Sequence, residues 1–432
     1  MSIDNQIKKG LGWTTISTIV IAVVAIVKIS VLARYLDKSD FGLMAIVTFV
    51  ISFMELFNDF GVSIGILHKQ EISKNEYHSL YWINLVISIF LFGILAILSP
   101  FIAMFYDMPQ LKDLLILIGV NLIISGIGRQ FKTIEQKELR FNYIAKVDML
   151  GAIISLGFAI YLAVSGYGVY SLVYSLIIQF AVVNICYFLN GIKKTGLSFH
   201  FSLKETVPFL KIGIYQVGGQ VANYFNRDLD VLLIGKFFSP SVLGSYSLAK
   251  QLVFRPFQFL NPIILRVASP VLARFQNDIN ELRRRYLEML NIISLLNIVV
   301  YCLLIIFAPL VISILYGNSF ENIILLVRLL SIYMIFRAIG NPVGSLVIAT
   351  GRTDLDFYWN ILLLLIMPMF IYVGSLFDVV GVAISLIVSM LVLYIPAWKV
   401  FINKLINVSL YDYLKACFVF DLVSIYSKFK KE

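Results

Sequence analysis

Apolar runs long enough to cross a membrane recur along the whole chain. A helix of about 20 apolar residues spans roughly 30 Å of hydrocarbon. The runs cover residues 11–33, 41–67, 79–105, 111–131, 143–164, 168–190, 208–237, 241–265, 287–315, 322–350, 357–377 and 380–401, with a weaker candidate at 410–426. The strands of a membrane barrel would be shorter and would alternate apolar with polar residues. The sequence therefore predicts an all-α polytopic membrane protein with about 12 transmembrane helices, or about 13 if the weaker candidate also spans.

Two halves of the chain repeat each other at low identity. The segment from Ala33 to Gly42 reappears 202 residues later, from Gly235 to Gly244, and residues 9–13 match residues 211–215 at the same offset. The repeat predicts two six-helix bundles, at residues 1–200 and 201–408, followed by a short tail at residues 409–432. Membrane proteins built from two similar bundles usually hold their substrate between them and rock one bundle against the other. The repeat therefore predicts a transporter.

Lysines and arginines are distributed unevenly between the predicted loops. With the N-terminus inside, the inner segments hold 21 of them and the outer loops hold 4. Because cytoplasmic loops carry an excess of basic residues, this bias predicts a cytoplasmic N-terminus. The first apolar run is too long for a secretory signal and lacks a small-residue cleavage site, so we interpret it as an uncleaved helix. The net charge of +10 follows from this topology, and nucleic acid is not an expected partner.

Motifs for catalysis, metal binding and nucleotide binding are missing. The sequence has no GxxxxGK[ST] loop, and its cysteines and histidines are isolated, without metal-ligand or redox spacing. These residues are Cys186, Cys302, Cys417, His68, His78 and His200. The predicted outer loops are short, whereas membrane-embedded polysaccharide polymerases and glycosyltransferases generally need a sizeable outer loop with charged residues around the sugar. We therefore predict no enzyme activity, no catalytic residue, no metal and no cofactor.

Ionisable residues within the apolar runs are the candidate functional residues. Each costs roughly 2.5–3.5 kcal/mol on insertion scales, so it normally faces a cavity or a partner. The basic set is Lys28, Arg227, Lys250, Arg255, Arg328 and Arg337, and the acidic set is Glu55, Asp59, Asp228 and Asp230. The surplus of positive charge suits an anionic ligand, and arginine forks suit pyrophosphate in particular. We predict that all the basic residues except Arg328 bind substrate, and that the four acids line the cleft and take part in coupling.

The spacing of these residues predicts some of their contacts. Glu55 and Asp59 are four residues apart and share a helical face. Arg227 and Asp230 are three apart and can pair, whereas the neighbours Arg227 and Asp228 cannot face each other directly. A purely structural role is the alternative for either aspartate. In that case Asp228 or Asp230 only neutralises the charge of Arg227.

Lys28 and Asp230 occupy equivalent positions in the two repeats. A charge at this depth is tolerable when it is paired or hydrated, so we expect the two side chains to attract each other in at least one access state. Two other positions have a structural alternative. Arg328 lies within snorkelling range of the outer interface, and Asp59 lies toward the inner end of its helix, where it can be half-solvated.

Several segments resemble the Wzx-type polysaccharide flippases, in the superfamily that also contains the multidrug and toxin extruders. The mid-chain segment Asn226-Arg227-Asp228-Leu229-Asp230-Val231-Leu232-Leu233-Ile234-Gly235-Lys236 is similar to the family's signature, as is Leu243-Gly244-Ser245-Tyr246. The segments at 266–273, 136–141 and 349–352 resemble the family's inner stretches. The resemblance covers about residues 5–405, nearly the whole chain.

The resemblance implies that the protein moves undecaprenyl-pyrophosphate-linked oligosaccharide from the inner to the outer leaflet of the bacterial cytoplasmic membrane. It implies alternating access of two six-helix bundles, with the first, second, seventh and eighth helices lining the cleft. The expected partners are this lipid-linked oligosaccharide, membrane lipids, and the polysaccharide polymerase and chain-length machinery. One departure concerns the end of the chain, since many relatives have fourteen helices and this sequence stops at Glu432 after the weak thirteenth candidate.

Two other functions remain as alternatives. A multidrug or toxin antiporter would share this architecture, but its substrates are typically cationic and would favour an acidic cleft. A polysaccharide polymerase or glycosyltransferase belongs to another class, and the short outer loops argue against it.

Overall fold

The computed structural model describes the backbone of residues 3–420, and it describes their side chains except those of residues 3–8, 212–216, 219 and 262–267. Every regular element in this part of the chain is a helix. The predicted all-α fold is therefore confirmed for the described residues. A chain in hydrocarbon must satisfy its own backbone hydrogen bonds, and an apolar helix does so within one segment.

The chain divides into two compact units, one comprising Met1–Gly244 with Leu315–Gly317, the other Ser245–Ile314 with Asn318–Glu432. The first unit contains α1 (Ile3–Leu32), α2 (Lys38–Asn58), α3 (Val62–His68), α4 (Lys74–Phe105), α5 (Gln110–Lys137), α6 (Phe141–Val164), α7 (Val169–Thr195), α8 (Leu203–Phe237) and the first turn of α9 (Pro240–Arg274). The second contains the rest of α9, most of α10 (Ile279–Tyr316), then η1 (Asn318–Ile323), α11 (Ile324–Ile339), α12 (Val343–Thr350), α13 (Thr353–Ser375), α14 (Val379–Ala397), η2 (Trp398–Asn403), α15 (Lys404–Ile406) and α16 (Leu410–Phe418). The bundle boundary near residue 200 stays a prediction.

Ten helical segments of the described chain are long and apolar enough to cross a membrane. Helices α8 and α9 are not among them, although each has 35 residues. A helix of that length extends for roughly 50 Å, so both helices are long enough to cross the hydrocarbon. Both also carry charged residues singled out above. The multi-pass architecture is therefore confirmed, whereas the count of twelve helices and the internal repeat stay predictions.

Three predicted helices differ from the observed ones. The run at 41–67 is interrupted between α2 and α3, and the run at 322–350 is interrupted at Gly340–Pro342, where proline cannot continue the hydrogen-bond ladder. The weak candidate at 410–426 begins as α16, which ends at Phe418 after 9 residues. Such a helix is only about 14 Å long and cannot cross a membrane. Residues 421–426 lie outside the described residues.

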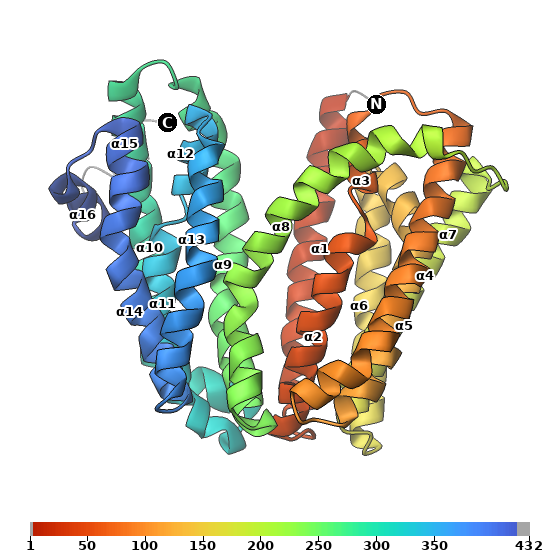
Figure 1. The fold of residues 1–432 in the computed structure, drawn as a ribbon, viewed down its shortest axis with the longest axis horizontal. Coiled ribbons are helices and arrows are strands. Elements are labelled where there is room, and N and C mark those ends of the chain that lie inside the picture. Colours follow the sequence, from red (N-terminus) through yellow and green to blue (C-terminus); the bar gives the residue numbers. More distant parts are fainter. Residues whose placement is uncertain (1–2, 421–432) are drawn as a thin grey trace. The chain divides into compact units, whose positions relative to one another are not determined.

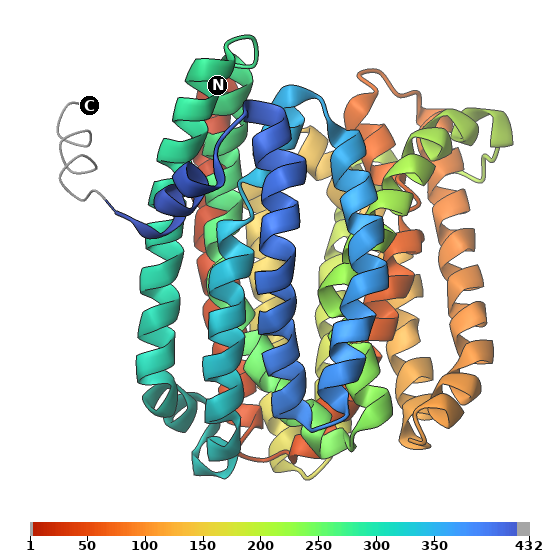
Figure 2. The same cartoon turned by 60° about the vertical axis from the view of Figure 1, so that its left-hand side comes forward.

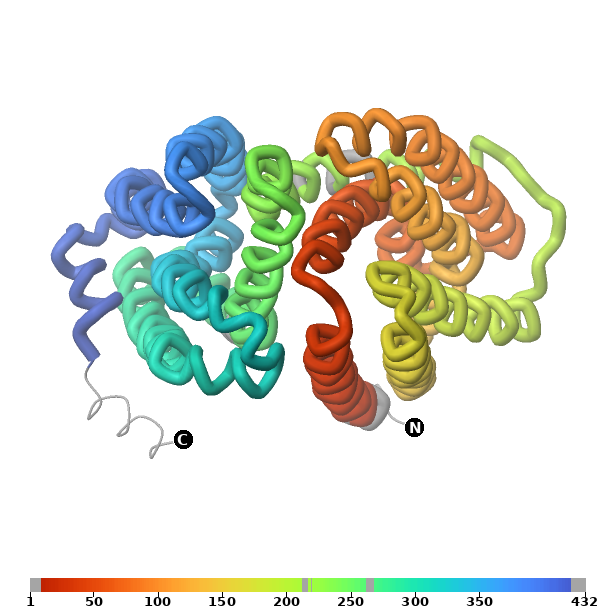
Figure 3. Tube along the Cα trace, turned by 90° about the horizontal axis from the view of Figure 1, so that it is seen from below, coloured from red at the N-terminus to blue at the C-terminus, as the bar shows by residue number. Residues whose placement is uncertain are grey.

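In the first unit, α4, α5 and α7 pack side by side, and α6 joins α7 to α1 (Figures 1 and 3). Glycines permit the closest approaches, because a Cβ on Gly128 of α5 would meet the backbone of Asn184 on α7. Helix α8 lies on α2, α3 and α4. The Tyr224 hydroxyl of α8 donates to the carbonyl of Phe49 on α2 at 2.5 Å. This contact helps to fix α8 beside the helix that carries Glu55.

The first turns of α2 and α9 cross through a reciprocal pair of glycines, all within the first unit. A Cβ on Gly42 would overlap the carbonyl oxygen of Pro240, and a Cβ on Gly244 would overlap the carbonyl oxygen of Lys38. Both pairs, Gly42 with Gly244 and Lys38 with Pro240, are separated by the 202 residues of the sequence repeat. The two glycines are thus separated by the offset of the predicted repeat, and each uses its missing side chain for a similar backbone contact.

In the second unit, α14 packs between α13 and α11 (Figure 2). A hydrophobic core of this unit contains Tyr286 of α10 and Phe401 of η2, together with Tyr413 and Cys417 of α16. The Tyr394 hydroxyl lies 3.0 Å from the Cys417 sulfur. Burial raises the pKa of the Cys417 thiol to about 11. This cysteine is therefore a packed thiol of the core.

Candidate functional site

The break between α2 and α3 creates a pocket at the two predicted acids of this region. Phe60 and Gly61 have φ angles of 43° and 74°, which end the helix after Asn58. Glycine adopts this left-handed conformation without penalty, whereas it is uncommon for phenylalanine. The resulting cavity has a volume of about 150 Å³ and is lined by Glu55, Leu56, Asp59, Gly61, Ile64, Val217 and Gln220. Helix α8 supplies the last two of these residues.

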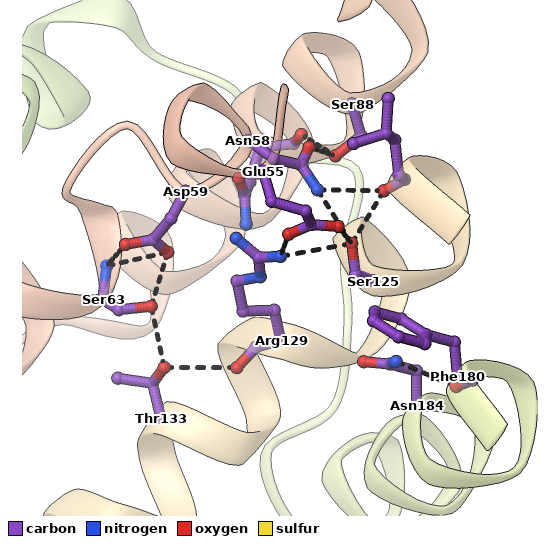
Figure 4. A network of polar contacts seen from close by, with 12 residues as sticks. Glu55, Asn58, Asp59, Ser63, Ser88, Ser125, Arg129, Thr133, Phe180 and Asn184 are labelled. Carbon is purple, nitrogen blue, oxygen red and sulfur yellow. Dashed lines mark hydrogen bonds and ion pairs between the residues drawn. The ribbon is translucent and has the colours of Figure 1, made fainter. Parts of the chain in front are cut away.

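Glu55 forms an ion pair with Arg129 of α5, as Figure 4 shows. Ser125 of α5 donates to the Glu55 carboxylate at 3.2 Å and accepts from the Asn58 amide at 2.8 Å. The amide oxygen of Asn58 in turn accepts from the Ser88 hydroxyl of α4 at 2.7 Å. The network therefore links α2, α4 and α5 through the acid that sequence analysis singled out.

Asp59, the last residue before the break, is held by residues beyond it. Its carboxylate accepts from the Ser63 hydroxyl at 2.5 Å, and Ser63 accepts from the Thr133 hydroxyl of α5 at 3.0 Å (Figure 4). Ser125, Arg129 and Thr133 follow one another at intervals of four residues, so they lie on one face of α5. One helical face thus contacts the residues on both sides of the α2–α3 break.

The charges around this pocket do not balance. Two carboxylates, Glu55 and Asp59, are accompanied by one guanidinium, that of Arg129, within the network. The side chains of Glu55 and Arg129 are 23% and 21% exposed, so water screens them only in part. Because the carboxylates outnumber the guanidinium, this pocket suits a proton or a cation more than an anion.

Lys28 contacts a neighbouring helix of the first unit. Its ammonium donates to the Ser155 hydroxyl of α6 at 2.9 Å, and Ser155 donates to the carbonyl of Ser175 on α7 at 2.8 Å. Asp230 is 8% exposed and accepts from the backbone N–H of Val231 at 2.9 Å. The attraction between Lys28 and Asp230 in at least one access state stays a prediction.

Arg227 pairs with the residue that we did not expect to face it. Its Nε atom lies 2.7 Å from the Asp228 carboxylate, and its guanidinium lies 5.5 Å from the ring centroid of Tyr224. The prediction that these neighbours cannot face each other was wrong. An arginine side chain is long and flexible, so its guanidinium can fold sideways across the helix surface to a carboxylate whose Cβ points elsewhere.

In the second unit, Lys250 and Arg337 meet on one aromatic ring. The Lys250 ammonium of α9 lies 5.4 Å from the ring centroid of Phe254, and the Arg337 guanidinium of α11 lies 5.3 Å from it. Arg337 also donates to the Tyr333 hydroxyl at 2.5 Å. Lys250 is only 7% exposed, and Arg255 is half-buried further along α9. The structure therefore brings together two of the predicted substrate-binding residues.

The family described as polysaccharide biosynthesis protein matches residues 31–325 of this chain. The chain belongs to that family. The resemblance to Wzx-type polysaccharide flippases that the sequence motifs predict is thereby confirmed. Among its relatives, the teichuronic acid biosynthesis protein TuaB of Bacillus subtilis is 30% identical over 417 residues, which are 95% of this chain and 85% of TuaB. The lipopolysaccharide biosynthesis protein WzxC of Escherichia coli is 28% identical over 424 residues, covering 96% and 84% of the two chains.

Solved structures of the MOP superfamily share the fold of this chain. The lipid II flippase MurJ in an inward closed conformation matches with a TM-score of 0.73 at 15% identity, over 97% of this chain and 92% of MurJ. An inward-facing multidrug resistance transporter of the MATE family matches with a TM-score of 0.65 at 15% identity, over 86% and 93%. At this identity the likeness concerns the fold alone.

The sequence did not identify Arg129 and Phe254 as residues of the candidate sites. Arg129 is near the end of the apolar run at 111–131, and it is one of the 21 basic residues counted in the inner segments. Its four-residue spacing from Ser125 and Thr133, together with two acids on the neighbouring apolar run, was the signal available. Phe254 had no such signal, because one more phenylalanine in an apolar run is indistinguishable from a core residue. Among the described residues, no group of three or more histidines, cysteines and acids could hold a metal.

Proposed function

We propose that the protein is a flippase for undecaprenyl-pyrophosphate-linked oligosaccharide repeat units, moving them from the inner to the outer leaflet of the bacterial cytoplasmic membrane. The observation that carries this proposal is the pair of cations, Lys250 and Arg337, on the ring of Phe254. Two cations held on one ring suit an anion with several oxygens, and a pyrophosphate can accept hydrogen bonds from both side chains. Family membership and the polysaccharide names of the relatives support the same substrate class.

In this proposal the protein binds and reorients its substrate without breaking a bond. Lys250 and Arg337 bind the anionic head, while Lys28, Arg227 and Arg255 contribute further positive charge. Glu55, Asp59, Asp228 and Asp230 balance that charge and couple binding to movement. The polysaccharide polymerase and the chain-length machinery would receive the translocated repeat unit as partners.

Replacing both Lys250 and Arg337 with alanine should abolish export without removing the protein from the membrane. Each charge-assisted hydrogen bond is worth about 1.5–3 kcal/mol, so we expect surface polysaccharide to fall by about tenfold or more. Lipid-linked repeat units should accumulate on the inner leaflet of cells in which this chain is the sole exporter. The matched control is Lys112→Ala with Arg328→Ala, which removes the same charges at exposed positions. Normal polysaccharide in the Lys250/Arg337 variant at an equal protein level would contradict the proposal.

A multidrug antiporter is the second candidate, and the pocket of the first unit favours it. Glu55 and Asp59 outnumber Arg129 there, which suits a cationic drug or its coupling proton. Cells expressing the protein would then expel ethidium, and Glu55→Gln would slow the efflux. Ethidium efflux together with unchanged polysaccharide in the Lys250/Arg337 variant would establish this alternative.

We propose a cytoplasmic N-terminus, because of the bias of basic residues between the predicted loops. Single cysteines can test this orientation in a background that lacks Cys186, Cys302 and Cys417. Cysteines at the exposed positions Gln70 and Asn277 should react only after the inner membrane is permeabilised, whereas those at Tyr167 and Ser319 should react in intact cells. The reverse pattern would overturn the orientation and leave the fold unaffected.

A further inference from the structure

The segment between α7 and α8, residues 196–202, is fastened to α4. The indole N–H of Trp82 donates to the carbonyl of Ser198 at 3.0 Å, and the backbone N–H of Ser202 donates to the Ser79 hydroxyl at 3.0 Å. Ser79 is fully buried and donates to the Glu205 carboxylate at 2.5 Å. This hydrogen bond, together with His200, lowers the pKa of Glu205. The connection is therefore held in one conformation from its α4 side.

The other side of this segment exposes large apolar side chains. Phe199 is 94% exposed although its ring stacks on Trp82, with centroids 4.7 Å apart. Phe201, Leu203 and Val207 are also more than half exposed. The first turns of α8 bury the opposite face, where Thr206 and Phe209 are covered. Phe209 packs with Val62, Ile66 and Leu80. The protein thus fixes a row of apolar side chains outside its own core.

Lysines are interleaved with these apolar residues. Lys193, Lys204 and Lys211 are exposed, and Glu205 is the only acid between residues 193 and 211. The segment begins directly where α7 ends, so it lies at the end of a membrane-spanning helix. Apolar side chains next to lysines at the end of such a helix are typical of a polypeptide in the headgroup layer. In that layer lysines bind anionic lipids, and aromatic rings lie among the glycerol groups.

We propose that this surface binds anionic phospholipid in the headgroup layer of the membrane. We call it the linker face, and it consists of Phe199, Phe201, Leu203, Val207, Lys193, Lys204 and Lys211. It fixes the beginning of α8 at the membrane surface. Because α8 supplies Val217 and Gln220 to the pocket that contains Glu55 and Asp59, the lipid contact also positions one wall of that pocket.

The depth of a nitroxide label at position 201 tests the proposal on the full-length protein. The label is attached to Phe201→Cys in a background without native cysteines, and the protein is reconstituted in vesicles of phosphatidylcholine with or without phosphatidylglycerol. Molecular oxygen collects in hydrocarbon, whereas a nickel chelate stays in water. We expect the ratio of oxygen to nickel collisions at position 201 to exceed that at Asn277→Cys by about threefold or more in vesicles with phosphatidylglycerol. Without phosphatidylglycerol the ratio at 201 should fall toward that at 277.

Lysine variants distinguish lipid binding from simple burial. Lys193→Gln with Lys204→Gln should remove most of the dependence on phosphatidylglycerol, whereas Lys112→Gln with Lys399→Gln should retain it. Inorganic phosphate should not reproduce the effect, because it cannot pull the label into hydrocarbon. Two results would overturn the proposal. One is a label as open to nickel at 201 as at 277 in both vesicle types, and the other is an equal oxygen-to-nickel ratio at 201 with and without phosphatidylglycerol, which would show that anionic lipid does not hold this surface.

Discussion

Replacing Gly42 with alanine is expected to destabilise the protein by about 3 kcal/mol, at the upper end of the cost of overpacking. The new Cβ would overlap the carbonyl oxygen of Pro240, and a backbone atom cannot move aside as the end of a flexible side chain can. The first turns of α2 and α9 would have to separate. Gly244→Ala should have a similar effect, since its Cβ would overlap the carbonyl oxygen of Lys38. Thermal unfolding of purified protein should show a loss of several degrees for each variant.

Other helical glycines provide matched controls for this prediction. A Cβ on Gly93 or Gly157 would meet no atom within 4 Å. Alanine at these positions should be neutral or slightly stabilising, because alanine loses less conformational entropy than glycine in a helix. The double variant Gly42→Ala with Gly244→Ala should cost less than the sum of the two single changes, since both relax the same crossing. Equal melting temperatures for Gly42→Ala and Gly93→Ala would contradict the assigned contact.

Removing Arg129 should be the most damaging single change at the pocket of the first unit. Arg129→Ala leaves Glu55 and Asp59 in the protein interior without the guanidinium that pairs with Glu55. Breaking a buried ion pair costs about 3–5 kcal/mol, and because both side chains are about one-fifth exposed we expect roughly 2–3 kcal/mol here. The amount of folded protein in the membrane and its melting temperature measure this loss.

A double-mutant cycle separates the ion pair from the packing of the arginine stem. The cycle compares Arg129→Gln, Glu55→Gln and the double variant. The double variant should be more stable than Arg129→Gln alone, because it leaves no unpaired carboxylate at position 55. Arg328→Ala is the control, because that side chain is exposed and should change stability by no more than about 0.5 kcal/mol. If Arg129→Ala behaves like Arg328→Ala, the pair contributes nothing to the fold.

The helices and their approximate positions follow from the sequence because hydrocarbon leaves the backbone no other partner. An apolar run in hydrocarbon has to satisfy its own backbone hydrogen bonds, and a helix does so within one segment. Glu55 and Asp59 could be placed on one face for a similar reason, since the spacing of four residues acts within one helix. The sequence motifs were also sufficient to identify the family, which the match over residues 31–325 confirms.

Contacts between helices required the tertiary structure. Periodicity tells which residues share a face of one helix, but it does not tell which helix that face meets. Arg129 could therefore not be assigned to Glu55, nor Lys28 to Ser155, before α5 and α6 were placed. The same holds for Phe254, whose ring brings two cations together only once α9 and α11 are packed.

The sequence by itself determined that this chain is a helical membrane protein of the polysaccharide biosynthesis family with charged residues inside apolar helices. The tertiary structure alone decided where α2 stops and what its acids contact. At the break, Phe60 and Gly61 adopt left-handed backbone angles, and Phe209 of α8 lies against Gly65 just beyond it. No local pattern specifies such a position, because a helix continues until packing on a neighbour compensates for the hydrogen bonds lost at its end.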